Sequence, residues 1–251
     1  MNLEAKNITC KVGNTVILQN FNCIFPYGEL IGILTSPKEK TELILKSLCG
    51  LYDLEEGEVL LENEIVNPIL EINLRSVRKK ISFVFRSGGL LSNLTILENL
   101  LLPLDFHFPE KTSEEKSKII NEYIAKFEID NSIFEMRPAQ LAVHEHKLIL
   151  IIRGFITEPK IILYEEPTDG LDIRSRVLVI REIFRRRKER KCIQIFSTHF
   201  ENKLMKYSDH LLVIDKGKLI ESGNIVELSE SEYLQTQLLL KDYLLSIENE
   251  T

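Results

Sequence analysis

Two short apolar runs in the second half of the chain constrain the fold more than any other feature. Residues 161–164 read IILY and residues 192–196 read CIQIF, and such runs are typical of parallel strands that are covered on both faces. Strands of this kind alternate with segments of helical period, which predicts an α/β sheet. From about residue 95 to residue 155 the pattern is helical, so we expect a helical insertion between two halves of the sheet.

The composition is that of an ordinary globular protein, and it excludes several classes of function. Of 251 residues, 44% are hydrophobic and 28% are charged, with a net charge of −6. This charge disfavours nonspecific nucleic-acid binding, so we expect no nucleic-acid partner. The basic run REIFRRRKERK at residues 181–191 has helical spacing and predicts a solvated helix face. The four cysteines have no metal-ligand spacing, and we interpret them as reduced core residues.

No segment of the sequence predicts direct membrane insertion. The first residues, MNLEAKNIT, lack the charged-then-apolar pattern of a signal peptide, and no apolar run is long enough to span a bilayer. We therefore expect a cytoplasmic protein whose membrane role, if it has one, comes through a partner.

A loop at residues 35–43, TSPKEKTEL, lies between a buried-looking strand and a helix. Residues 29–34 predict the strand and residues 43–49 predict the helix. This is the setting of a phosphate-binding P-loop, whose glycines let successive N–H groups converge on the phosphates and whose lysine neutralises them. The sequence has no glycine between Gly32 and Gly50, so it predicts a broken phosphate cradle.

Several other short stretches carry a family resemblance, and they stand in register over most of the chain. Residues 161–172, IILYEEPTDGLD, resemble a Walker B strand, a catalytic glutamate and a D-loop, and residues 196–199, FSTH, resemble a switch-histidine strand. Residues 94–104, LTILENLLLPL, resemble the segment after a Q-loop, where membrane subunits dock. Residues 2 to about 226 thus resemble the nucleotide-binding subunit of an ATP-binding-cassette (ABC) transporter.

This resemblance implies a fold and a division into domains. The expected fold is α/β, with a RecA-like P-loop NTPase core, an N-terminal antiparallel β subdomain and an inserted helical subdomain. The expected ABC-type domain covers residues 1–226, with its core at 1–86 and 156–226 and its helical subdomain at 87–155. Residues 227–251 are expected to form a C-terminal helical tail, leucine- and tyrosine-rich, that is used for docking.

The family's nucleotide-facing motifs align with unusual residues in this sequence. Thr41 stands at the P-loop lysine, Arg86 at the Q-loop glutamine, and Val12 at the aromatic that stacks on adenine. A cation at the Q-loop position would repel Mg²⁺. The equivalents of the nucleotide-binding positions are Thr35, Lys38, Lys40, Thr41, Glu42, Leu43, Arg86 and Glu165. The equivalents of the signature motif LSGGQ are Leu141, Ala142, Val143, His144 and Glu145.

Three functional positions of the family keep their residue types. The resemblance implies that Glu166 is the catalytic glutamate, that His199 contacts the γ-phosphate and that Asp172 belongs to the D-loop. Glu166 could instead serve only hydrogen bonding at the strand end, and His199 could instead bridge a dimer interface. No metal site is expected at His144, because its spacing from the next histidine points the two side chains apart on a helix.

Three hypotheses of function follow. The first is a degenerate ABC subunit that binds MgATP weakly or not at all, whose docking residues Leu94, Glu98 and Leu102 contact a membrane permease, and which dimerises with itself or a second ABC subunit. The second is an active ABC ATPase in which Lys38 or Lys40 replaces the missing lysine. The third is a scaffold with the ABC fold and no membrane partner. The resemblance places the protein on the inner face of the cell membrane. The stretches LTILENLLLPL and MRPAQL most resemble the branch that includes lipid-transport (Mla/Mce-type), lipoprotein-release and cell-division ABC subunits, so lipid transport is the expected cargo class.

Overall fold

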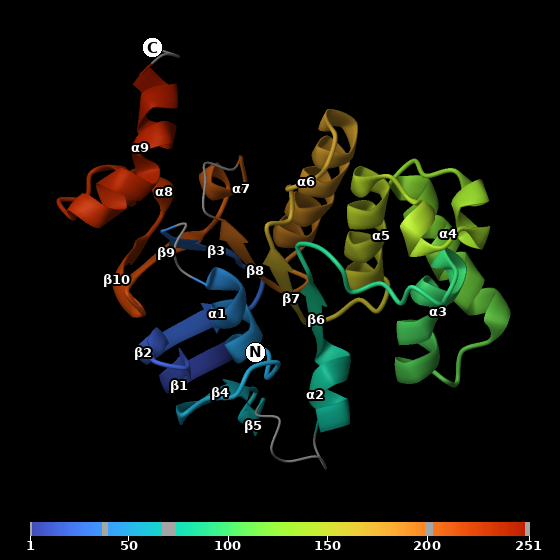
Figure 1. Cartoon of the computed structure of the whole chain (residues 1–251), viewed down its shortest axis with the longest axis horizontal. Coiled ribbons are helices and arrows are strands. Elements are labelled where there is room, and N and C mark those ends of the chain that lie inside the picture. Colours follow the sequence, from blue (N-terminus) through green and yellow to red (C-terminus); the bar gives the residue numbers. More distant parts are fainter. Residues whose placement is uncertain (1, 37–39, 67–73, 199–202, 249–251) are drawn as a thin grey trace.

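The chain folds into two sheets with helices between and around them (Figure 1). The structure, a computed structural model, describes residues 2–36, 40–66, 74–198 and 203–248. The antiparallel sheet has the order β2-β1-β4-β5, with strands Asn2–Val12 (β1), Thr15–Pro26 (β2), Glu56–Leu61 (β4) and Glu64–Ile65 (β5). The second sheet has the order β10-β9-β3-β8-β7-β6, with strands Leu30–Thr35 (β3), Ile81–Val84 (β6), Ile161–Glu165 (β7), Ile193–Thr198 (β8), His210–Asp215 (β9) and Lys218–Gly223 (β10).

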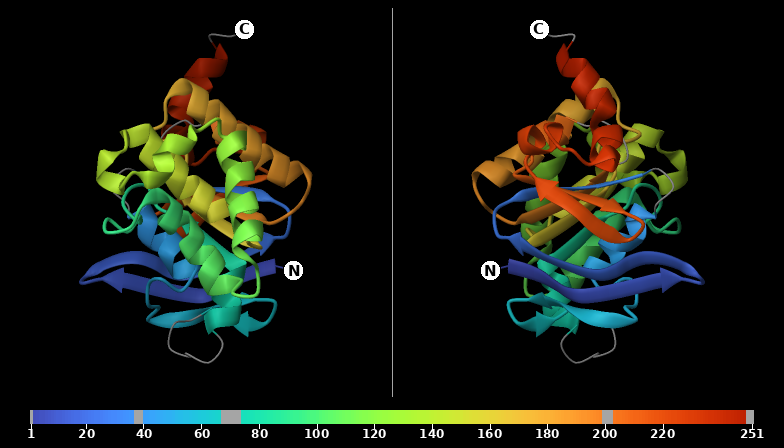
Figure 2. Two further views of the ribbon diagram at one scale, coloured as in Figure 1. Left: turned by 90° about the vertical axis from the view of Figure 1, so that its right-hand side faces the viewer. Right: turned by 90° about the vertical axis from the view of Figure 1, so that its left-hand side faces the viewer.

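The second sheet confirms the predicted parallel core. Strands β7 and β8 are parallel neighbours, with Ile161 opposite Ile193, and β3 runs parallel to both β8 and β9. Only the edge strand β10 pairs antiparallel among the described strands of this sheet. The antiparallel sheet forms a separate layer beneath it (Figure 2). The predicted fold class, an α/β RecA-like core with an N-terminal antiparallel β subdomain, is therefore confirmed.

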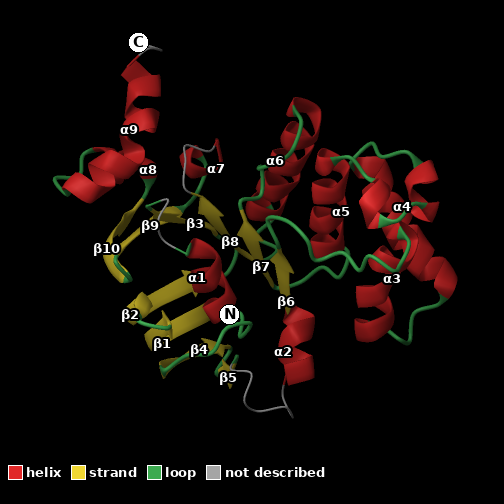
Figure 3. Cartoon of the chain, viewed as in Figure 1, coloured by secondary structure: helices red, strands yellow, loops and turns green. Residues whose placement is uncertain are grey.

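Helices cover both faces of the parallel sheet (Figure 3). The helix α1 packs between the two sheets, because its buried residues share one core cluster with residues of both. The helices after β6 share a second cluster with the opposite face of the parallel sheet. The described helices are α1 (Thr41–Leu48), α2 (Leu74–Lys80), α3 (Ile96–His107), α4 (Ser113–Lys126), α5 (Val143–Phe155), α6 (Ile173–Lys188), α7 (Lys203–Lys206), α8 (Ile225–Ser229) and α9 (Leu234–Glu248), with short 3-10 helices at Asn131–Glu135 (η1) and Pro138–Gln140 (η2).

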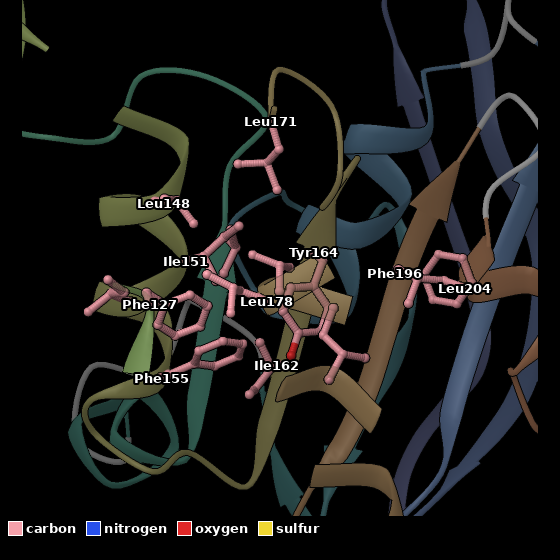
Figure 4. Close-up of a cluster of buried hydrophobic side chains, with 14 of the residues drawn as sticks. Phe127, Leu148, Ile151, Phe155, Ile162, Tyr164, Leu171, Leu178, Phe196 and Leu204 are labelled. Atoms are coloured by element: carbon pink, nitrogen blue, oxygen red, sulfur yellow. The ribbon is translucent and has the colours of Figure 1, made fainter. Parts of the chain in front are cut away.

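The period-2 alternation of the strands decides which core each side chain enters. On β7, Ile161 packs in the cluster that contains α1, whereas Ile162 and Tyr164 pack in the cluster formed with α5 and α6. In the latter cluster the ring of Phe155 lies edge-on to that of Tyr164, with centroids 6.1 Å apart (Figure 4). Apolar residues at successive positions are therefore all buried, which is why the strand reads as a continuous apolar run.

Helices α3, α4 and α5 fill the expected helical insertion, and local capping sets where two of them begin. The Thr95 N–H donates to Glu98 Oε2 at 2.7 Å, and the Glu98 N–H donates to Thr95 Oγ1 at 3.2 Å. Thr112 and Glu115 form the same reciprocal pair at the start of α4. Such capping boxes satisfy backbone donors that have no partner inside the helix. The domain boundaries at residues 87, 156 and 227 stay predictions.

The basic run at residues 181–191 is exposed or half-buried at each of its basic positions except Arg186, so the predicted solvated face fails only there. The Arg186 side chain is fully buried, and its guanidinium donates to Glu182 Oε1 at 3.0 Å, to Glu158 Oε1 at 3.0 Å and to the Tyr123 hydroxyl at 2.5 Å. The prediction was wrong here because carboxylates from two segments and a phenol from α4 compensate the buried charge, and the sequence of α6 alone shows only one of these partners.

The cysteines are free, as expected, but only two of the four are fully buried. Cys10 and Cys192 are core residues, while Cys23 and Cys49 are half-buried. Burial still raises the pKa of the Cys23 thiol to about 11 and that of the Cys49 thiol to about 12. All four therefore stay protonated at neutral pH.

None of the helices that the structure describes is both long enough and apolar enough to cross a membrane. The last of them, α9, carries exposed apolar side chains at Leu234 and Leu238, in the segment that the sequence predicts to be a docking tail.

Candidate functional site

The carboxyl ends of the parallel strands bring most of the predicted site residues to one edge of the sheet. Strands β3, β8, β7 and β6 are consecutive neighbours and run in the same direction. Ligands of open α/β sheets bind outside this edge. Of the predicted residues, Lys38 and His199 lie outside the described residues, so the structure does not place them.

A pair of threonines closes the start of the P-loop equivalent. Thr35 ends β3 and Thr41 begins α1, both side chains are buried, and their Oγ1 atoms lie 2.5 Å apart. The family's lysine position therefore holds a neutral hydroxyl that is bonded back to the protein. No ammonium stands at this point of the chain.

The remaining described positions of the loop also differ from a phosphate cradle. Lys40 is exposed, has φ −89° and, among described residues, makes no side-chain capping bond at the start of α1. A negative φ is open to any residue, so this glycine-equivalent position has lost the left-handed geometry of a nest. Glu42 lies half-buried in the first turn of α1, where the family has a magnesium-binding hydroxyl. Leu43 packs against the core between the two sheets.

Arg86 forms an ion pair where the family has a metal-binding glutamine. Its Nε atom lies 2.7 Å from Asp169 Oδ2, and its N–H donates to Glu165 Oε2 at 3.2 Å. The hydrogen bond with Asp169 and the charge of that carboxylate raise the pKa of Arg86 above its ordinary value. A guanidinium thus lies beside the acidic end of β7.

The acidic residues after β7 keep an unusual backbone. Glu165 is half-buried at the end of β7, and Glu166 follows with φ +44°, in the left-handed region. The Asp169 N–H donates to the Glu166 carbonyl at 3.2 Å and closes the turn. A non-glycine residue with positive φ is uncommon and costs of order 1 kcal/mol, so the surrounding contacts must hold Glu166 in place.

Sequence reasoning missed two residues of the site, Asp169 and Lys147. The Lys147 side chain is only 2% exposed, and Nζ donates to the carbonyls of Phe85 (3.0 Å), Arg86 (3.2 Å) and Glu165 (3.1 Å). Burial lowers its pKa to about 8, against the opposing attraction of the nearby carboxylates. The signal was present in the sequence, because Lys147 interrupts the apolar face of α5, four residues before Ile151.

The signature equivalents form the start of α5, beside the D-loop. Ala142 lies directly before α5, and its N–H donates to Glu145 Oε2 at 2.8 Å. His144 Nε2 lies 3.6 Å from Asp172 Oδ2, so the two motifs meet within one chain. Asp172 caps α6, where the Ser175 N–H donates to its carboxylate and lowers its pKa. Val143 is 76% exposed, and its apolar side chain cannot hydrogen-bond to a phosphate.

Of the three predicted docking residues, only Leu102 lines a groove on the described surface around α3. Leu102 lines a groove of about 500 Å³, together with Leu91, Phe106 and Phe83. Glu98 instead caps α3, and the bond from Thr95 lowers the pKa of its carboxyl group. Leu94 is half-buried in the turn before α3. The docking role of Leu94, Glu98 and Leu102 stays a prediction.

The donor set can be tested against the metal and nucleotide that the fold implies. Within residues 2–36, 40–66, 74–198 and 203–248, no three His, Cys, Asp or Glu side chains gather closely enough to hold a metal ion. Arg86 and Lys147 place two cations at the acidic strand ends, and Thr41 replaces the phosphate-binding lysine. The described residues thus do not fit magnesium nucleotide in the manner of a P-loop.

The fold and the order of motifs define the class of protein, a single cassette of the ATP-binding-cassette type. The sequence profile described as ABC transporter matches residues 18–169. This chain belongs to the ABC transporter family. A bacterial ABC transporter cassette solved as a dimer, MJ0796, superposes with a TM-score of 0.81 at 25% identity and covers 89% of this chain and 98% of that one.

Curated relatives confirm the family and name several unrelated cargoes. The spermidine/putrescine import ATP-binding protein PotA of Pasteurella multocida is 26% identical over 91% of this chain and 60% of its own length. The ribose import ATP-binding protein RbsA of Caldanaerobacter subterraneus is 26% identical over 93% of this chain and 47% of its own. The sulfate/thiosulfate import ATP-binding protein CysA of a Synechocystis strain is 23% identical over 92% and 62%. The chain spans at most about 62% of the length of these three relatives.

Proposed function

We propose that this chain is a transporter-associated ABC subunit that acts as a structural or regulatory partner and does not itself hydrolyse ATP. The observation that carries the proposal is the buried hydroxyl pair of Thr35 and Thr41 at the start of the P-loop equivalent. Phosphoryl transfer depends on positioning and on neutralising the charge of the phosphates. A threonine in place of the lysine removes that charge, and Arg86 faces the space where the family binds a metal.

A second cassette and a membrane permease are the proposed partners. The relatives are named as import ATP-binding proteins, and the superposed cassette was solved as a dimer. In a dimer of this chain with itself, each composite site would pair a broken cradle with a broken signature. In a mixed dimer, a partner's intact cradle would supply the chemistry, so ATP turnover by the complex is assigned to the partner.

Nucleotide titration tests the proposal directly. The purified chain should show only weak MgATP binding by calorimetry, and its ATP turnover should equal that of Glu166→Gln. Saturable micromolar binding, with turnover abolished by Lys40→Ala and kept in the matched variant Lys46→Ala, would establish the alternative of an active ATPase with a relocated lysine. Lys40 directly precedes α1 and Lys46 lies in the last turn of α1. Comparing the two variants therefore distinguishes a role of the loop lysine from a general effect of removing a lysine near α1.

The cargo stays a prediction. The sequence pointed to the lipid-transport branch, whereas the three relatives named above carry spermidine, ribose and sulfate in their names. These cargoes share no chemistry, so likeness of the cassette does not select a substrate. Copurification of the native permease and its loading with lipid or polyamine would decide between them.

A further inference from the structure

Each of the three N–H donors of the Lys147 ammonium has a protein carbonyl oxygen as its acceptor. An ammonium has three N–H donors, and Lys147 Nζ meets three carbonyls, those of Phe85, Arg86 and Glu165, at 3.0 to 3.2 Å. Two of these carbonyls follow β6 and the third ends β7. A side chain from α5 thus joins the ends of two neighbouring strands.

The charges around Lys147 explain why a cation is needed there. Glu165, Asp169 and Glu166 attract the ammonium, in this order of strength. Neighbouring carboxylates repel one another, and a nearby cation offsets this repulsion. In a P-loop site this cation is the metal, together with the P-loop lysine. Here Arg86 pairs with Asp169 on the exposed side, and Lys147 lies on the buried side.

We propose that Lys147, assisted by Arg86, is a tethered cation that takes the place of a bound metal ion at the ends of β6 and β7. The hydrogen bond from the Arg86 backbone N–H to Glu165 then forms without a bound metal or nucleotide. Lys147 is a positioning residue, because it acts on the backbone of its neighbours. The inference deepens the proposed function and rests on it. A chain that binds no magnesium nucleotide must balance the carboxylates at these strand ends with a cation of its own.

Amide hydrogen exchange on the full chain measures this arrangement. The relevant amides are those of Arg86, whose N–H donates to Glu165, and of Asp169, whose N–H donates to Glu166. In the native protein their exchange should be the same in excess MgCl2 and in EDTA. In Lys147→Met, which keeps all but the terminal atom of the side chain's length and loses the charge, exchange should be about tenfold faster, because three carbonyls lose their donor.

Two controls separate charge from volume. Lys116→Met removes another buried lysine, whose Nζ pairs with Asp105 at 2.7 Å, and it should leave the two amides unchanged. In Lys147→Ala, added n-propylammonium should restore slow exchange, whereas n-propanol should not. Equal rescue by both compounds would mean that Lys147 only fills space, and unchanged exchange in Lys147→Met would overturn the proposal.

The same measurements keep this inference apart from the proposed function. Tight MgATP binding by the native chain would end the proposed function but leave the Lys147 result standing. Slower exchange of the Arg86 and Asp169 amides on adding Mg²⁺ to the native chain would show that a metal still completes the site. That outcome overturns the tethered-cation proposal even if the chain hydrolyses no ATP.

Discussion

The Oγ1 atoms of Thr35 and Thr41 lie 2.5 Å apart inside the protein, at the point where an ABC cassette holds a phosphate. Because Thr35 ends β3 and Thr41 begins α1, this bond joins the strand to the helix across the loop. A bond that closes the loop from within stabilises the chain itself and needs no ligand to form.

Removal of this bond should destabilise the protein. We expect Thr41→Val, which keeps the shape, to lower the free energy of unfolding by about 1 kcal/mol, since the buried Thr35 hydroxyl loses this partner. Urea denaturation measures the change. Thr15→Val, at an exposed position of β2, should change it by less than about 0.5 kcal/mol. Equal effects of the two substitutions would contradict the role of the buried pair.

The buried arginine network should be more sensitive. We expect Arg186→Met to cost about 2–3 kcal/mol, because Glu182, Glu158 and the Tyr123 hydroxyl lose a shared donor, while Arg185 and Lys126 still pair with Glu182. The matched control is Arg181→Met, an exposed position on the same helix, where the expected change is near zero. Thermal unfolding of both variants tests this, and a mild effect at Arg186 would show that other cations of α6 take over the pairing.

Acid should weaken the protein partly through Asp209. Burial alone would raise the pKa of this carboxyl group, but the Arg187 guanidinium and the Leu30 N–H, both donating to it, outweigh burial and lower the pKa. A carboxyl whose folded pKa lies below its unfolded value stabilises the fold above the unfolded pKa, and this contribution is lost as the pH falls through the folded pKa.

The pH prediction is therefore a difference between variants. The free energy of unfolding, measured in urea from neutral pH down to about pH 3, should fall less steeply for Arg187→Gln than for the native chain. Lys188→Gln, at the exposed neighbouring position, should keep the native slope. The assignment to Asp209 fails if the two variants have the same slope.

Docking should depend on the groove at Leu102. This side chain is 43% exposed and lines the groove with Leu91 and Phe106. Leu102→Asp places a charge on an apolar contact, so less permease should copurify with the chain, by about tenfold or more. Leu51→Asp changes another exposed leucine, 51% exposed and outside this groove, and should leave recovery unchanged. Normal recovery with Leu102→Asp would point to a different docking surface.

Some features of this protein were readable from the sequence because they depend on neighbours along the chain. The apolar runs predicted β7 and β8 as parallel neighbours, and the order of motifs predicted the cassette. The capping box of Thr95 and Glu98 also follows from a spacing of three residues. The sequence analysis named Glu98 only as a docking residue and did not predict this capping bond.

Only the tertiary structure decided how the charges are used. Lys147 and Phe85 are 62 residues apart in the chain, and Arg186 and Tyr123 are 63 apart, so no local pattern pairs them. The charged group of a lysine or arginine has its lowest free energy when it is hydrated. It can be buried only where carbonyls and carboxylates from distant parts of the chain surround it. The sequence by itself determined the cassette and the absence of glycine between Gly32 and Gly50. The fold determined which of the chain's own cations lie at the strand ends, because electrostatic compensation depends on distance in space.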